Sequence, residues 1–274
     1  MSSLSGGPND PVDDLVSVMF AELYGALALH SLPEGRTRSE DAYSLFYRRS
    51  AAMGWLTPSR PGELGGMWGM NEAEVAPASG PDRSRVAWFQ VVRTHTAPDG
   101  VPVQAFLACI AQVIERMADL RLDAAQFLLP ADPVGRGQAA SREGFRTAES
   151  LLEGARWFAD VQPSRRAPVR VTVDGGAAPA FREQAEVVAR WLGGLAQDVF
   201  VYESVSLEEP DHLVLGPMAV GWQLESHNRV TFCGTLAEWS LDAIGWLAAF
   251  IADGAIRNGV SSQLGFAVER TGGV

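Results

Sequence analysis

The chain has 274 residues, a formal net charge of −11 and 47% hydrophobic residues. This length and composition allow one large domain or two of ordinary size, and they exclude disorder of the whole chain. All 22 basic residues are arginine. Lysine-dependent chemistry is therefore excluded, including Schiff-base and pyridoxal-phosphate enzymes, P-loop nucleotide binding and protein kinases. The acidic balance also disfavours nucleic acid as a partner, because phosphate neutralisation requires a basic face.

The sequence has no feature of an exported or membrane-inserted protein. Residues 1–10 lack a basic region followed by an apolar one, so we expect no signal peptide. The longest near-continuous apolar run, 243–252, is about half of what a membrane-spanning helix requires. Cys109 and Cys233 lie in apolar segments far apart, which indicates reduced, buried thiols. We therefore expect a cytoplasmic protein without membrane contacts.

The first half contains both helical and strand patterns. In chain order these are an apolar segment at 15–29 that fits a helix or a long strand, a helix at 39–55, a glycine-rich flexible loop at 62–70, a strand at 84–96, a helix at 102–120 and a strand at 125–129. The turn sequence Pro98-Asp99-Gly100 separates the strand at 84–96 from the helix that follows it.

The second half is easier to interpret. An amphipathic helix at 144–159 precedes a strand at 169–174, a helix that begins at Pro179, strands at 199–205, 213–224 and 228–233, a helix at 236–257 and a strand at 264–270. Thr235 and Glu238 have capping-box spacing, and Asn258-Gly259 is a helix stop. The helix at 236–257 is apolar almost all round, so we expect it to be buried against a sheet on one side and another element on the other. A second subunit in a homodimer could supply extra burial.

Together these elements predict an α+β protein. We expect two similar β-α-β-β-α-β-like halves, 1–130 and 168–274, with antiparallel sheets backed by helices and a helical linker at 131–167. The block at 84–129 resembles the block at 228–269 in element order and spacing, which suggests an internal duplication.

Candidate catalytic residues are few. His95 and His227 lie beside turns and could act as general bases near neutral pH with a neighbouring carboxylate. The alternative is that both are exposed turn residues. The acidic cluster at 208–212 could bind a cation, but a solvated loop explains it better. No histidine or cysteine has metal-ligand spacing, so we expect neither a metal nor a cofactor.

Candidate ligand-binding residues are aromatic or sulfur-containing. Trp68, Met67 and Met70 lie in the loop at 62–70, and such side chains anchor adaptable interfaces or cover apolar pockets. Trp222 and Trp246 could line a cavity between sheet and helices, where a buried indole N–H requires a partner. Packing within the core is the alternative for every one of these tryptophans.

Three functions fit these observations. The first is a non-enzymatic binding protein that holds an apolar or aromatic small molecule or docks a partner protein. The second is a cofactor-independent enzyme of small-molecule metabolism that uses a His/carboxylate acid–base pair. The third is an acidic inhibitor or immunity-type protein for a basic partner, whose opposite charge would speed association.

Overall fold

The structure is a computed structural model that describes residues 18–31, 40–56, 68–77, 84–93, 102–130, 148–176, 178–208 and 228–272. These residues form eight strands: β1 (Val18–Leu29), β2 (Trp68–Val75), β3 (Arg85–Arg93), β4 (Ala118–Leu129), β5 (Ala167–Asp174), β6 (Phe200–Ser206), β7 (Arg229–Leu236) and β8 (Leu264–Arg270). They also form five α-helices: α1 (Ala42–Ala52), α2 (Val103–Met117), α3 (Ala148–Ala155), α4 (Ala180–Gly194) and α5 (Leu241–Arg257).

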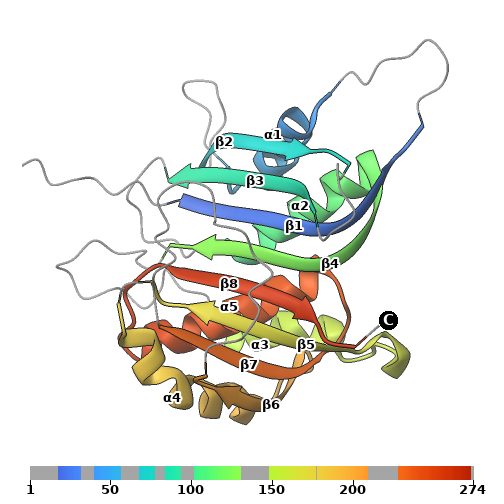
Figure 1. The fold of residues 1–274 in the computed structure, drawn as a ribbon. Coiled ribbons are helices and arrows are strands. Elements are labelled where there is room, and N and C mark those ends of the chain that lie inside the picture. The colour runs from blue at the N-terminus through green and yellow to red at the C-terminus, as the bar shows by residue number, and fades with distance from the viewer. Residues whose placement is uncertain are drawn as a thin grey trace, which may run out of the picture.

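All eight strands belong to one antiparallel sheet, in the order β2-β3-β1-β4-β8-β5-β7-β6 (Figure 1). The predicted α+β class is therefore confirmed. The expectation of a separate sheet in each half is wrong, because β4 and β8 pair edge to edge. Their pairing runs from Ala124 opposite Glu269 to Leu129 opposite Leu264.

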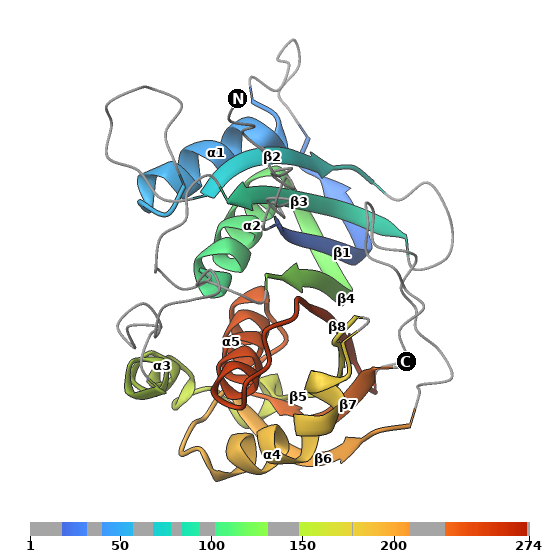
Figure 2. The ribbon, with the colours of Figure 1, turned by 90° about the vertical axis from the view of Figure 1, so that its left-hand side faces the viewer.

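The described helices all lie on one face of this sheet (Figure 2). The alternation of β1 directs Met19, Ala21 and Leu23 toward the helices, where they are buried. One hydrophobic cluster between sheet and helices contains residues of both halves, among them Phe89, Phe106, Phe181 and Phe232. In the described part of the chain, no helix is both long enough and apolar enough to cross a membrane.

The apolar helix α5 begins later than the sequence suggests. Thr235 belongs to β7, and the helix N-cap is Ser240, whose Oγ accepts a hydrogen bond from the Ala243 N–H at 3.1 Å. An N-cap must leave the preceding strand first, so Thr235 cannot serve as one. The predicted stop is confirmed, since Asn258 is the C-cap and Gly259 has a φ of 81°.

The apolar circumference of α5 is covered within the chain. Helices α2, α3 and α4 all contact α5, and the opposite side packs against the sheet. Gly154 of α3 lies so close to Trp246 that a Cβ there would come 2.2 Å from Cη2 of the indole. The four sides of α5 are thus buried without a second subunit, and the homodimer stays a prediction.

Several other boundaries differ from the predictions. The segment at 15–29 forms strand β1 from Val18 onward. Strand β4 begins at Ala118, directly after α2, whereas we expected a helix up to residue 120 and a strand from 125. The predicted flexible loop at 62–70 is wrong for its last residues, because Trp68–Met70 begin strand β2. The strand predicted at 213–224 lies outside the described residues.

Both edge strands of the sheet contain a β-bulge. Asn71 is the extra residue in β2, and Glu203 is the extra residue in β6. Beside β6, the Phe200 N–H donates to Gln197 Oε1 at 2.8 Å, and Gln197 Nε2 donates to the Phe200 carbonyl oxygen. The Gln197 amide thus occupies the backbone groups to which another strand would bind. Bulges and such contacts are features by which proteins avoid edge-to-edge association.

Candidate functional site

On the sheet face opposite the helices, here called the helix-free face, a row of cross-strand neighbours runs over all eight strands, and most of its members are polar. From β2 to β6 the cross-strand neighbours are Glu74, Trp88, Glu22, Gln126, Ala267, Thr172, Thr231 and Ser206. Of the seven buried polar residues in the described chain, five lie on this face: Glu22, Gln126, Thr172, Asp174 and Thr231. Burying polar groups costs free energy unless they are hydrogen-bonded.

Glu22 is the centre of the larger polar cluster. The Tyr24 hydroxyl donates to Glu22 Oε2 at 2.8 Å, and Arg85 Nη1 donates to Glu22 Oε1 at 2.7 Å. The Tyr24 oxygen also lies 3.4 Å from Gln126 Oε1. The Glu22 side chain is only 3% exposed, whereas that of Arg85 is 43% exposed. A buried carboxylate thus holds an arginine at the surface.

The local backbone explains why these side chains meet. Glu22 and Tyr24 are two residues apart in β1 and therefore share a face, and Arg85 pairs with Tyr24. Directly after Tyr24 the register of β1 against β4 shifts at Gly25, whose φ is 153°. A Cβ at Gly25 would lie 2.1 Å from the Arg121 carbonyl oxygen, so this close approach of two strands requires glycine.

Aromatic side chains extend the cluster toward the sheet edge. The Arg85 guanidinium carbon lies 5.7 Å from the centroid of the Trp88 ring, within the range of a cation–π contact. Trp88 Nε1 donates to Glu74 Oε2 at 3.2 Å, and its ring lies 5.8 Å from that of Phe20. Trp88 is half-buried and Glu74 is exposed, so this part of the cluster reaches solvent.

The ionisable groups of the cluster favour positioning over proton transfer. Burial, followed by the Glu22 charge, raises the pKa of Tyr24 well above its usual range, so the phenol stays protonated at neutral pH. The hydrogen bond to Glu22 likewise raises the pKa of Arg85. Each oxygen of Glu22 already accepts a hydrogen bond from a donor that keeps its proton. The arrangement therefore holds Arg85 in place rather than activating a base.

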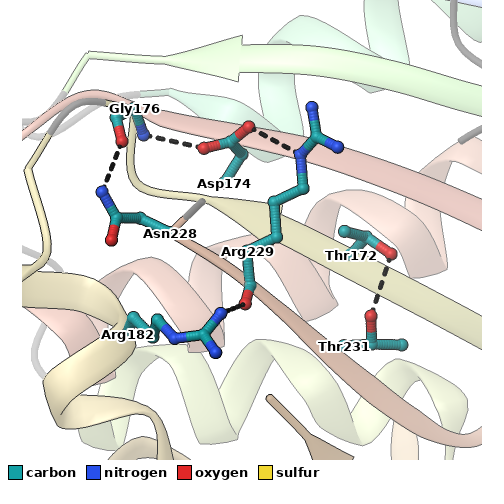
Figure 3. A network of polar contacts seen from close by, with 7 residues as sticks. All are labelled: Thr172, Asp174, Gly176, Arg182, Asn228, Arg229 and Thr231. Carbon is teal, nitrogen blue, oxygen red and sulfur yellow. Dashed lines mark hydrogen bonds and ion pairs between the residues drawn. The ribbon is translucent and has the colours of Figure 1, made fainter. Parts of the chain in front are cut away.

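A second network connects β5, β7 and α4 (Figure 3). Arg229 Nε donates to Asp174 Oδ2 at 3.1 Å, and the Gly176 N–H donates to Asp174 Oδ1 at 2.8 Å. Asn228 Nδ2 donates to the Gly176 carbonyl at 2.9 Å, and Arg182 Nη1 donates to the Arg229 carbonyl at 3.1 Å. Two of these hydrogen bonds join the end of β5 and its turn to the start of β7, one lies within the turn, and one joins α4 to β7. We interpret this network as structural.

No protein-family model, curated protein or solved structure matches this chain. The described residues contain no group of three or more His, Cys, Asp and Glu that could hold a metal ion.

Of the seven predicted site residues, Trp68, Met70 and Trp246 lie in the described part of the chain. His95, His227, Met67 and Trp222 lie outside the described residues. Trp68 is buried at the start of β2, and Met70 is half-buried on the same strand, both packed against the core. Trp246 lies in α5 of the other half, 8% exposed, and its ring is 6.3 Å from that of Phe250.

The sequence analysis missed the Glu22 cluster. A signal was present, since Glu22 and Tyr24 interrupt an apolar segment two residues apart, as polar residues on one face of a strand do. Because the segment at 15–29 also fits a helix, this two-residue spacing was not recognised as that of a strand. Arg85 and Gln126 could not have been assigned to the cluster, because only strand pairing brings them near β1.

Proposed function

We propose that this protein is a non-enzymatic binding protein that docks a partner protein through the helix-free face, at the outer strands β2 and β3. The docking surface, here called the Trp88 surface, consists of Glu72, Glu74, Arg85, Trp88 and Gln90. The observation that carries the proposal is the half-exposed Trp88 beside an exposed Arg85 that buried Glu22 holds in place. Tryptophan and arginine are enriched among the residues that dominate binding energy.

Preorganisation supports this location. A guanidinium that is already hydrogen-bonded and placed over an indole loses little side-chain freedom on binding, which lowers the entropic cost of association. The surface also combines an aromatic centre with charged residues around it, as protein interfaces do. The bulges in β2 and β6 disfavour docking at the sheet edges. A partner would therefore dock on the broad face of the sheet rather than along its edges.

The space between sheet and helices gives less support for a small-molecule site. The aromatic side chains there are packed against each other, as in the contact of Phe46 with Phe106, whose ring centroids are 5.8 Å apart. Phe46, Phe89 and Phe106 are almost fully buried. A close-packed core of this kind offers a ligand little room.

We further infer that the halves are two copies of one β-α-β-β-α-β unit, the motif called ferredoxin-like. From one edge of the sheet inward the order is β2-β3-β1-β4, and from the other edge inward it is β6-β7-β5-β8. In both halves this is the second, third, first and fourth strand of the half. In each half an acid of the first strand pairs with the arginine that begins the third strand, as Glu22–Arg85 and as Asp174–Arg229. The second strand of each half contains a bulge. On this proposal, 131–167 is the linker.

Site-specific photocrosslinking in the native cell tests the docking proposal. A photoreactive amino acid replaces Gln90 on the Trp88 surface, and a control protein carries it at exposed Val187 on α4. We expect a discrete protein adduct from position 90 and none from position 187. The purified partner should then bind the Trp88→Ala variant at least tenfold more weakly. Adducts from α4 alone, or unchanged affinity of the variant, would refute the proposal.

The other functions have their own tests. Native mass spectrometry of the protein as purified would reveal a retained small apolar ligand as a mass excess that disappears on denaturation. Cofactor-independent catalysis would require turnover that His95→Ala or His227→Ala abolishes. Either result would replace partner docking as the preferred function.

A further inference from the structure

We infer that the partner of the Trp88 surface presents a basic segment, with an arginine or lysine that binds against the Trp88 ring and the carboxylates of β2. The inference depends on the proposed docking function and specifies the chemistry of the partner. It rests on the charges around Trp88 and on the geometry of the ring.

The charges on the surface do not cancel. Glu22 and Arg85 form an ion pair and offset one another. Glu74 lies directly across from Trp88, and Glu72 directly across from Gln90, and both carboxylates are exposed. Counting Glu22, Glu72, Glu74 and Arg85, the described residues here carry a net charge of −2 (−3 + 1). The surface belongs to a chain of net charge −11, whose long-range field attracts cations.

The Trp88 ring is suited to a cation. Arg85 lies 5.7 Å from its centroid, so the indole already makes one cation–π contact within the chain. The hydrogen bond from Trp88 Nε1 to Glu74 Oε2 places a carboxylate at the ring edge. An incoming arginine or lysine would meet the exposed part of the indole and the Glu74 carboxylate beside it. Such a combination discriminates between basic and acidic partners.

A negatively charged partner is disfavoured at the Trp88 surface. An acidic segment or a nucleic acid would bring negative charge against Glu72 and Glu74, and Arg85, the basic group that the described residues place beside them, is already paired with Glu22. Juxtaposed like charges suppress binding of wrong partners.

A matched pair of variants tests the inference with a labelled nona-arginine peptide as the probe. Glu72→Gln/Glu74→Gln removes two charges from the Trp88 surface, and Glu183→Gln/Glu186→Gln removes two from the exposed face of α4. Both variants change the net charge by the same amount, from −11 to −9 (−11 + 2). We expect at least tenfold weaker peptide binding in the first variant and less than a twofold change in the second. Equal weakening, or none, would show diffuse attraction and overturn the inference.

A third variant tests the ring. Trp88→Phe retains an aromatic ring but weakens cation–π binding and removes the N–H that orients Glu74, so we expect a three- to tenfold loss of peptide affinity. Unchanged affinity would overturn the role of the indole.

A crosslinked partner at position 90 whose interface is acidic would refute this inference and leave the docking function intact. A lack of any adduct at position 90 would instead refute the docking function.

Discussion

Phe127 of β4 and Phe266 of β8 lie directly opposite each other where the two halves of the sheet join. Their rings are stacked, with centroids 5.0 Å apart and planes inclined by 9°. Both side chains are almost fully buried on the helix side of the sheet. The junction between the halves is therefore part of the core, and the two halves should unfold together.

Truncating this pair should destabilise the whole protein. Phe127→Ala should lower the free energy of unfolding by about 3–5 kcal/mol, because it removes a buried aromatic side chain and leaves a cavity. Denaturant unfolding followed by far-UV circular dichroism and by tryptophan fluorescence should give coincident transitions. Phe127→Leu, which fills part of the space, should cost less. Two separated transitions in the parent protein would contradict a shared core.

Burial of the Tyr24 phenol beside the Glu22 carboxylate should make stability depend on alkaline pH. The pKa of Tyr24 in the folded protein is raised above its ordinary value of 10.0, so folding favours the neutral phenol. The stability that the folded protein gains from the neutral Tyr24 phenol is complete below pH 10.0, and it is lost as the pH rises toward the folded-state pKa. Urea unfolding between pH 7 and 11 should show a steeper decline in the parent protein than in Tyr24→Phe.

The same variant has an effect at neutral pH. Tyr24→Phe leaves Glu22 Oε2 without its donor in a buried position, which should cost about 1–3 kcal/mol. Tyr43→Phe is the control, because Tyr43 is exposed on α1. Equal stability of the two variants at pH 7 would mean that the Tyr24 hydrogen bond contributes nothing measurable.

The contact between α3 and α5 should not tolerate a methyl group. Gly154→Ala would place a Cβ 2.2 Å from the Trp246 ring and force the helices apart, at a cost of about 1–3 kcal/mol. Gly194→Ala, at the end of α4, is the matched control, since no atom lies within 4 Å of its Cβ position. The control should be neutral or stabilising by up to about 1 kcal/mol. Thermal unfolding measures both, and equal melting temperatures would be evidence against the contact.

Gln197 should protect the β6 edge from self-association. Gln197→Ala frees the outward backbone groups of Phe200 while costing only about 1 kcal/mol of stability. Sedimentation velocity over a range of concentrations should detect larger species in this variant than in the parent protein or in Gln162→Ala, which changes an exposed glutamine elsewhere. A Gln197→Ala protein of the same size as the parent would show that the bulge at Glu203 is sufficient protection.

The success of the sequence analysis varied with the type of element. Strand β5 and helix α4 were predicted because alternation and helical periodicity are local properties of the chain. Strand β2 was missed because Trp68–Met70 follows several glycines, and its pairing with β3 is not visible in either strand alone. The start of β4 was placed too late because no turn residue separates it from α2.

The amino-acid sequence by itself determined the α+β class, the absence of lysine chemistry and the acidic charge, because composition and periodicity are properties of the chain itself. Tertiary structure alone decided that β4 pairs with β8 to form one sheet, and that Arg85 and Gln126 meet Glu22. Contacts between residues dozens of positions apart depend on strand order and register. Many strand orders bury the same apolar residues, so hydrophobic pattern does not select among them, whereas the packed fold does.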